Sequence, residues 1–113
     1  MTSNKNSTRY YSGRQEKRVA KALNGRCVPN SGAASFVAGD VTTDDWLIEC
    51  KTVTKEQSSF SIKKEWLIKN KEEAFAMNKS YSALAFDFGD NDEVYYVLDE
   101  KTFKLLKNQL EDN

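Results

Sequence analysis

The stretch that decides the fold is Asp45-Trp46-Leu47-Ile48-Glu49-Cys50-Lys51, because apolar and charged side chains alternate along it. In an extended strand, successive side chains point to opposite faces, so Glu49 and Lys51 share one face. The opposite face collects the side chains of Trp46, Ile48 and Cys50. Leu47 is the exception, since it is apolar on the charged face. The pattern predicts a half-buried strand that presents a carboxylate and an ammonium group away from its core face.

A second strand precedes this one and can fold back onto it. Residues 36–41 (FVAGDV) read as a strand, and a turn is expected at residues 42–44, where Thr and Asp are typical turn residues. Because antiparallel neighbours run in opposite directions, this hairpin returns Asp40 to the side of Glu49. We therefore expect two carboxylates and the Lys51 ammonium group within a few ångströms of one another.

The remaining segments predict helices and strands on either side of the hairpin. Helices are expected at residues 13–23 and 62–77 and after an Asp99 cap, and strands at residues 26–29, 81–88 and 93–98. Ser12 and Gln15 have the spacing of a capping box, which sets the first helix start near Gly13. The order α-β-β-β-α-β-β-α predicts one α/β domain over residues 12–113, preceded by a flexible basic arm at residues 1–11.

Two of these helices should bury an apolar side. The expected buried side of the helix at residues 62–77 carries Ile62, Trp66, Glu73 or Ala74, and Met77. The shared face of the last helix carries Phe103, Leu106 and Leu110. Trp66 is therefore interpreted as a core residue rather than as a platform for nucleobases.

The composition excludes several function classes. The chain contains no histidine, which excludes Ser-His-Asp triads and histidine-ligated metal sites. Cys27 and Cys50 form no zinc-binding pattern and are expected to be buried, reduced thiols. The longest apolar run, near residues 83–86, is too short to span a bilayer, and the N-terminus lacks the apolar segment of a secretory signal. We expect a cytoplasmic protein without a membrane partner or a small-molecule cofactor.

Charge is distributed unevenly along a chain whose net charge is zero. Residues 1–79 carry 14 Lys and Arg against 9 Asp and Glu, whereas residues 80–113 carry 3 against 8. A basic half beside an acidic half is typical of a protein with one surface for a polyanion, although charge runs are also ordinary solvated faces. The pattern indicates nucleic acid as a partner.

Carboxylates with a lysine, in a chain without histidine, favour metal-dependent phosphodiester hydrolysis. Mg²⁺ prefers oxygen ligands, which Asp40, Glu49 and the backbone carbonyl of Cys50 can supply. A bound Mg²⁺ or Mn²⁺ ion lowers the pKa of a water molecule and offsets charge on the phosphate. Lys51 can orient that water or neutralise the developing negative charge. Asp44 and Asp45 are alternative metal ligands, but both are more simply interpreted as turn residues.

Glu16 is a further candidate for the same site. It precedes Val19, Ala20 and Leu23 at helical spacing, so it is expected on the buried side of the first helix. A carboxylate on an apolar stripe is costly unless it is paired or metal-bound. The alternative is that Glu16 stabilises the first turn through the helix dipole.

Glu16, Asp40 and Glu49-Cys50-Lys51 together resemble the E…D…ExK signature of PD-(D/E)XK nucleases, and in particular the short Holliday-junction resolvases of phages and archaea. The resemblance covers roughly residues 12–52, including the small loop Asn30-Ser31-Gly32. Gly39 stands where the motif has its variable proline. The resemblance implies a restriction-endonuclease-like α/β core, with a central mixed sheet flanked by helices, one or two Mg²⁺ ions, and cleavage that leaves a 5′-phosphate.

Several residues outside this signature are candidates for DNA contact. They are Arg9 and Arg14 in the basic N-terminal segment, Ser31 in the small loop, and Lys63 and Lys64 before the second long helix. Backbone amides in a small loop can approach an anion, and lysines bind phosphates as point charges. The simpler interpretations are an Asn-Ser-Gly turn for Ser31 and a solvated helix face for the lysines.

A chain this short offers little surface for reading base sequence, so shape and backbone recognition is expected. We expect a structure-specific endonuclease for branched DNA, acting as a symmetric homodimer, because cutting both strands of a junction needs two sites. The late strand or the last helix, with Tyr95, Tyr96 and Phe103, is the expected dimer interface. Alternatives are another PD-(D/E)XK phage nuclease, restriction-like or single-strand-specific, and a catalytically inert DNA-binding module of the same fold.

Overall fold

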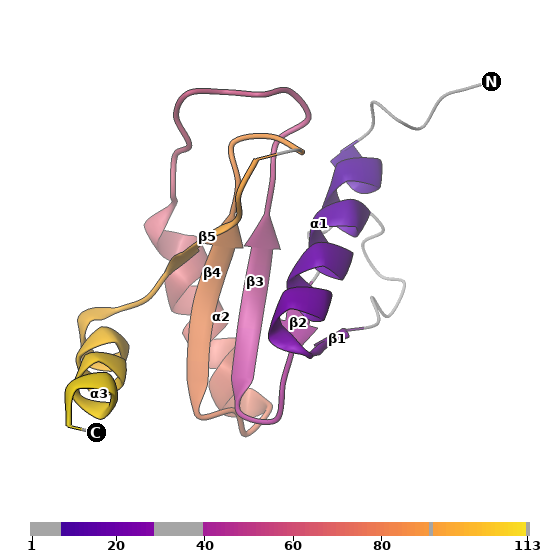
Figure 1. Cartoon of the computed structure of the whole chain (residues 1–113). Coiled ribbons are helices and arrows are strands. Elements are labelled where there is room, and N and C mark those ends of the chain that lie inside the picture. The colour runs from indigo at the N-terminus through magenta and orange to yellow at the C-terminus, as the bar shows by residue number, and fades with distance from the viewer. Residues whose placement is uncertain (1–7, 29–39, 91, 113) are drawn as a thin grey trace.

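The chain forms a layered α/β structure, seen here in a computed structural model that describes residues 8–28, 40–90 and 92–112 (Figure 1). The elements in chain order are α1 (Thr8–Leu23), β1 (Arg26–Cys27), β2 (Asp40–Thr42), β3 (Trp46–Lys51), α2 (Lys64–Ala76), β4 (Tyr81–Phe86), β5 (Tyr95–Val97) and α3 (Glu100–Glu111). This order confirms the sequence-based one. Residues 36–39 of the predicted second strand, and Ser31, lie outside the described residues.

The strands form one mixed sheet in the order β1-β2-β3-β4-β5. Strands β3 and β4 are parallel, and every other neighbouring pair is antiparallel. A parallel pair requires a crossover, which α2 provides between β3 and β4. Helices α1 and α2 lie on opposite faces of the sheet (Figure 1). The expected α/β core with a mixed sheet flanked by helices is therefore present.

Helix α1 packs on the apolar face of the sheet. Its Val19, which is 1% exposed, shares a core with Ile48 and Cys50 of β3 and with Ala83 and Ala85 of β4. The alternation in residues 45–51 thus directs its even-numbered side chains toward α1, as predicted. Cys50 is buried, whereas Cys27 is exposed, so the expectation of two buried thiols is wrong for Cys27, which lies in the short strand at the edge of the sheet.

Helix α2 covers the other face, which explains the exceptional Leu47. Leu47 and Leu84, both fully buried, lie on this face, and Asn70 of α2 donates a hydrogen bond of 2.9 Å to the Ala83 carbonyl. The buried side chains of α2 are Asn70 and Ala74. The predicted buried side is therefore wrong at its ends, since Ile62 and Met77 flank the helix and are 38% and 41% exposed.

The sequence predicts the end of α1 correctly but not its start. The helix ends as expected, since Asn24 adopts a φ of 57° and the Gly25 amide donates to the Ala20 carbonyl. A Cβ at Gly25 would come within 2.5 Å of the Thr42 carbonyl oxygen, so only glycine fits there. The start at Gly13 is wrong, because α1 already begins at Thr8. The predicted arm over residues 1–11 therefore includes helical residues.

Helix α3 begins at Glu100, and Asp99 caps it as predicted by accepting a 2.8 Å hydrogen bond from the Thr102 amide. The helix lies beside the sheet rather than over it (Figure 1). Its apolar residues are largely exposed, with Phe103 at 61% and Leu110 at 80%. The shared face predicted for α3 is thus not buried within the described part of the chain. In that same part, the helices all lack the combination of length and apolar character that crossing a membrane requires.

Candidate active site

The strand register brings Asp40 directly opposite Glu49, which confirms the predicted hairpin geometry. Paired residues of antiparallel strands point to the same face, and Lys51 lies two residues further along that face. The Lys51 ammonium nitrogen lies 3.2 Å from Glu49 Oε2. The side chains of Lys51 and Glu49 are 21% and 12% exposed, so this ion pair is largely withdrawn from water. The sheet face under α2 therefore holds two carboxylates and an ammonium group together.

Negative charge is concentrated around Asp40. Burial and the nearby charges of Glu49, Glu73 and Glu16, in that order, raise the pKa of Asp40 to about 7, and the Lys51 charge opposes the rise. Carboxylates held together in a low-dielectric site repel one another, which favours the protonated form of one of them. A bound divalent cation would relieve this repulsion. The carboxylates therefore form a donor set that suits a hard metal ion.

Glu16 belongs to the same electrostatic cluster, although α1 covers the opposite sheet face. Its charge raises the pKa of Asp40, and after burial it is the largest cause of the raised pKa of the Cys50 thiol. Strand β2 lies near the sheet edge, so an α1 side chain can approach Asp40 there. Glu16 thus contributes to the electrostatic surroundings of Asp40, and its role as a ligand stays a prediction.

Glu73 of α2 is an acidic neighbour that the sequence did not identify as part of the site. It lies two helical turns beyond Trp66, whose ring centroid is 4.5 Å from the Lys51 ammonium nitrogen. A helix running back along β3 from Lys51 carries its next turns toward Glu49 and Asp40. The seven-residue spacing of Trp66 and Glu73 is the signal that could have indicated this shared side.

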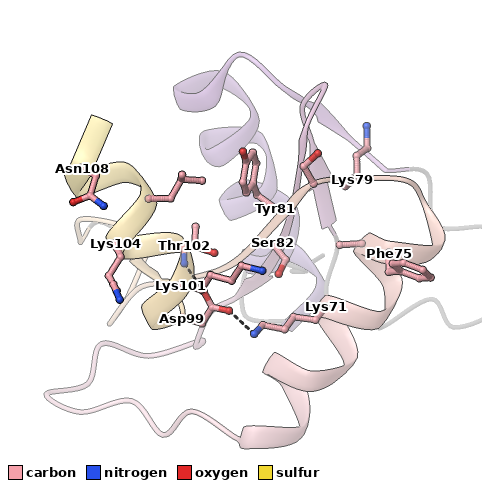
Figure 2. A pocket seen from close by; sticks show the side chains of 13 residues that line it. Lys71, Phe75, Lys79, Tyr81, Ser82, Asp99, Lys101, Thr102, Lys104 and Asn108 are labelled. Atoms are coloured by element: carbon pink, nitrogen blue, oxygen red, sulfur yellow. Dashed lines mark hydrogen bonds and ion pairs between the residues drawn. The ribbon is translucent and has the colours of Figure 1, made fainter. Parts of the chain in front are cut away.

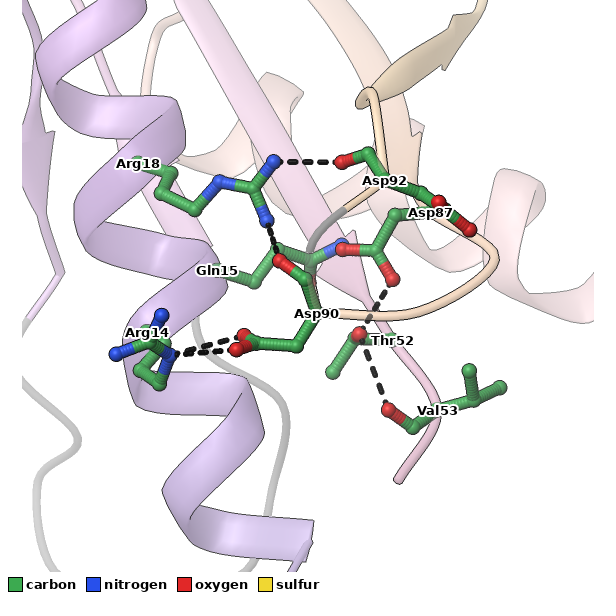
Figure 3. Close-up of polar contacts among 8 residues, drawn as sticks. All are labelled: Arg14, Gln15, Arg18, Thr52, Val53, Asp87, Asp90 and Asp92. Carbon is green, nitrogen blue, oxygen red and sulfur yellow. Dashed lines mark hydrogen bonds and ion pairs between the residues drawn. The ribbon is translucent and has the colours of Figure 1, made fainter. Parts of the chain in front are cut away.

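The backbone of Lys51 is fastened to α1 by a buried side chain. The Gln15 amide nitrogen donates to the Lys51 carbonyl at 2.5 Å and to Asp87 Oδ2 at 3.1 Å. Asp87 in turn accepts a 2.5 Å hydrogen bond from the Thr52 hydroxyl (Figure 3). Gln15 is 2% exposed and Asp87 is fully buried. Burial raises the pKa of Asp87, and its hydrogen bonds from Thr52, the Gly89 backbone and Gln15, together with the Arg18 charge, oppose that rise.

Arg14, a predicted DNA contact, has an intramolecular partner. Its Nε donates to both carboxylate oxygens of Asp90 at 2.9 and 3.0 Å, which raises the pKa of Arg14 (Figure 3). Arg18 donates to the backbone carbonyls of Asp90 and Asp92 at 2.5 and 2.6 Å. These arginines hold α1 against the turn after β4. The remaining exposed surface of Arg14, 46% of its side chain, still faces solvent.

The other predicted contacts are distributed differently. Lys63 and Lys64 are exposed where α2 begins, and the Lys63 ammonium nitrogen lies 5.8 Å from the Trp66 ring centroid. Arg9 is in α1, but its side chain lies outside the described residues, as does Ser31. Asp44 and Asp45 are exposed in the turn between β2 and β3, which agrees with their interpretation as turn residues.

Within residues 8–28, 40–90 and 92–112, no group of three or more acidic or thiol side chains is already arranged as a metal cage. Asp40 and Glu49 are the pair that the register brings together, and Glu49 is engaged with Lys51. Cys50 directs its thiol into the α1 core, as expected if only its carbonyl serves the site. The register places Asp40 opposite Glu49, and the raised pKa of Asp40 reflects burial and a charge repulsion that a bound cation would relieve.

A groove of about 710 Å³ between α2 and α3 lies apart from this site (Figure 2). Its lining combines lysines and hydroxyl groups with Phe75 and Tyr81. The acid in the lining, Asp99, is paired with Lys71. Asp99 also caps α3. The groove lining therefore lacks the pair of acidic residues that metal-dependent hydrolysis needs.

Comparisons of the chain with protein-family models, with curated proteins and with solved structures find no match in any of the three. Function is therefore inferred from the chemistry and geometry of the residues themselves.

Proposed function

We propose that this chain is a metal-dependent DNA endonuclease of the PD-(D/E)XK type. The observation that carries the proposal is the register of β2 and β3, in which Asp40 faces Glu49 while Lys51 contacts Glu49 at 3.2 Å. Paired carboxylates beside an ammonium group on one strand face correspond to the D…ExK arrangement. The mixed sheet between α1 and α2 also fits the restriction-endonuclease-like core that this signature implies.

The residues of the site divide the chemistry among them. Asp40 and Glu49 would hold Mg²⁺ or Mn²⁺, with Glu16 and the Cys50 carbonyl as further oxygen ligands. When bound, the ion would supply an activated water molecule and stabilise charge on the phosphate. Lys51, held between Glu49 and the Trp66 ring, is suited to neutralise the charge that develops on the phosphate during hydrolysis.

We further propose branched DNA as the substrate and a homodimer in the cytoplasm as the active form. Exposed Phe103 and Leu110 give α3 an apolar face that a second copy could cover. The strand tyrosines Tyr95 and Tyr96 belong to opposite sheet faces, so α3 is the better candidate interface. Two sites related by a twofold axis would allow both strands of a junction to be cut.

A catalytically inert DNA-binding module of the same fold is the second candidate. It is favoured by the Lys51–Glu49 ion pair, which occupies one of the carboxylates a metal would need. The two candidates differ in their response to divalent ions, because an inert module has no reason to bind them through Asp40.

The experiment is a nicking assay with Mg²⁺ on a four-way junction and on linear duplex. Wild type should cut the junction, whereas Asp40→Ala and Lys51→Ala should lose activity by about a hundredfold or more. Lys69→Ala, an exposed α2 lysine, is the matched control and should retain activity. Equal cleavage by wild type and Lys51→Ala would contradict the catalytic assignment, and equal cutting of both DNAs would contradict branch specificity. Mn²⁺ binding by calorimetry that Asp40→Ala abolishes would exclude the inert module.

A further inference from the structure

Aromatic side chains form a continuous row whose first ring, that of Trp66, contacts the Lys51 ammonium group. The row consists of Trp66, Phe60, Phe86, Phe88 and Tyr95. Ring centroids are separated by 6.3 Å between Trp66 and Phe60, by 5.0 Å between Phe60 and Phe86, and by 5.8 Å between Phe86 and Tyr95. Phe88 closes the row by contacting both Phe86 and Tyr95.

The sheet register explains why this row points to the face of the proposed active site. Lys51 of β3 pairs with Phe86 of β4, and Phe86 pairs with Tyr95 of β5. Residues paired across neighbouring strands share a face, so the ammonium group and the two rings form one line across three strands. Trp66 and Phe60 approach the same line from α2 and from the loop before it.

The row differs from a core. Every ring in it remains partly accessible, and Tyr95 is 44% exposed. The central residues of both sheet faces, such as Ile48 and Leu84, are at most 2% exposed. Contiguous accessible apolar surface of this kind is typical of binding sites. Trp66, interpreted from the sequence as core, is likewise only partly buried.

Positive charge accompanies the aromatic surface. The ammonium nitrogens of Lys51 and Lys63 lie 4.5 and 5.8 Å from the Trp66 ring centroid. Both ammonium groups lie at the Trp66 end of the row, so a phosphate bound there would place the following bases along the accessible rings. A duplex cannot use such rings, because its bases are already stacked on one another, whereas unpaired bases can stack on them.

We infer that this aromatic row binds the unpaired bases of a DNA strand whose neighbouring phosphate lies at Asp40, Glu49 and Lys51. The substrate class is therefore DNA with unpaired nucleotides beside the cleaved bond, as at a branch point or in a single-stranded segment. The position of the cleaved phosphate rests on the proposed nuclease function. The stacking of bases on the row does not require cleavage.

The test compares two neighbouring tyrosines of β5. Tyr95 and Tyr96 have similar exposures, 44% and 39%, but point to opposite faces, and only Tyr95 contacts Phe86 and Phe88 among the described residues. Binding of a fluorescent oligothymidine and of a linear duplex is measured by anisotropy in Ca²⁺ for wild type, Tyr95→Ala and Tyr96→Ala. Circular dichroism establishes that both variants are folded.

Tyr95→Ala should weaken oligothymidine binding about tenfold, while Tyr96→Ala should change it less than about twofold. Duplex binding should be the same for all three proteins. The inference is overturned if Tyr95→Ala binds oligothymidine as tightly as wild type, or if both variants lose the same amount of oligothymidine affinity. It is also overturned if wild type binds the duplex more tightly than oligothymidine. Tyr95-dependent binding without any cleavage supports the inference and contradicts the proposed nuclease function. Cleavage without Tyr95-dependent binding supports the nuclease function and contradicts the inference.

Discussion

The side-chain amide of Gln15 lies 2.5 Å from the main-chain carbonyl of Lys51, and so joins α1 to the end of the strand that carries the proposed catalytic lysine. The same amide donates to the buried carboxylate of Asp87. Its oxygen, Oε1, has no hydrogen-bond partner among the residues that the structure describes. The amide orientation is fixed, because its flipped form would bring an oxygen against two acceptors.

Replacing Gln15 with the similarly shaped Met should slow cleavage more than it weakens DNA binding. The change removes the Gln15 donor from the Lys51 carbonyl and from Asp87 Oδ2 in a buried place, at a cost of about 1–3 kcal/mol of unfolding free energy, while Asp87 Oδ1 keeps its bond from Thr52. Single-turnover rates and DNA affinities of the variant separate positioning from binding. Because Lys51 loses its anchor, we expect the rate constant to fall about tenfold with an unchanged affinity.

Asn70→Leu is the matched control for Gln15→Met. Asn70 is also a 2% exposed amide that donates to a backbone carbonyl, at 2.9 Å, and its oxygen also lacks a partner in the described part of the chain. It should lose similar stability yet keep the cleavage rate. Equal rate losses in both variants would show that Gln15 acts through general stability alone.

Asp40→Asn should stabilise the metal-free protein at neutral pH. The pKa of Asp40 is about 7 in the folded protein and about 3.9 in an unfolded chain, so the folded state binds more protons between these values. Stability therefore falls as pH rises from about 4 to 7, by up to about 1.4 kcal/mol per pH unit. Urea unfolding with EDTA at pH 5 and pH 8 should show this loss in wild type.

Asp40→Asn should remove that component of the pH dependence, whereas Asp44→Asn in the exposed turn should preserve it. A wild-type stability that does not decrease between pH 5 and pH 8, with no difference from Asp40→Asn, would contradict the raised pKa. The same substitution should abolish metal binding, so added stability and lost function would come from one carboxylate.

Glu73→Gln should lower the pKa of Asp40, because it removes one of the negative charges that raise it. The Asp40 carboxyl carbon can be followed by NMR in the metal-free protein as the pH is changed. Glu72→Gln, which changes the exposed neighbour on α2, is the control and should leave the midpoint in place. Identical midpoints in wild type and Glu73→Gln would remove Glu73 from the site.

Glu substitutions on α3 should dissociate the proposed dimer. Phe103 and Leu110 are 61% and 80% exposed, and a buried charge at either position would oppose association. Sedimentation velocity over a range of concentrations should show a dimer for wild type and a monomer for Phe103→Glu and Leu110→Glu. Asn108→Glu, which changes a polar residue of the same helix, should remain dimeric. A wild type that stays monomeric throughout would exclude this interface.

The hairpin could be predicted because its information is local. Alternation along residues 45–51 distinguishes the two strand faces, and the short turn then brings Asp40 back to Glu49. Leu47 appeared exceptional only because the sequence did not reveal that α2 covers the charged face as well. A strand pattern reports which side chains share a face, but not what packs on that face.

The contacts of Gln15 could not be predicted from the same kind of pattern. Its spacing from Ser12 suggested a capping box, in which Gln15 would reach back to the helix start. In the structure its amide instead bonds Lys51 and Asp87, which are 36 and 72 residues away. Long-range hydrogen bonds of this kind leave no periodic signal. The capping-box interpretation of Ser12 and Gln15 therefore predicted a helix start later than the observed Thr8.

The pairing of Arg14 and Arg18 with the turn after β4 has a consequence for how this sequence can vary. Surface turns ordinarily accept insertions and deletions. Here the backbone carbonyls of Asp90 and Asp92 accept hydrogen bonds from Arg18 of α1, the helix that also carries Glu16. A change in the length of this turn would be transmitted as a rotation of α1, so an apparently peripheral loop should tolerate new residues poorly.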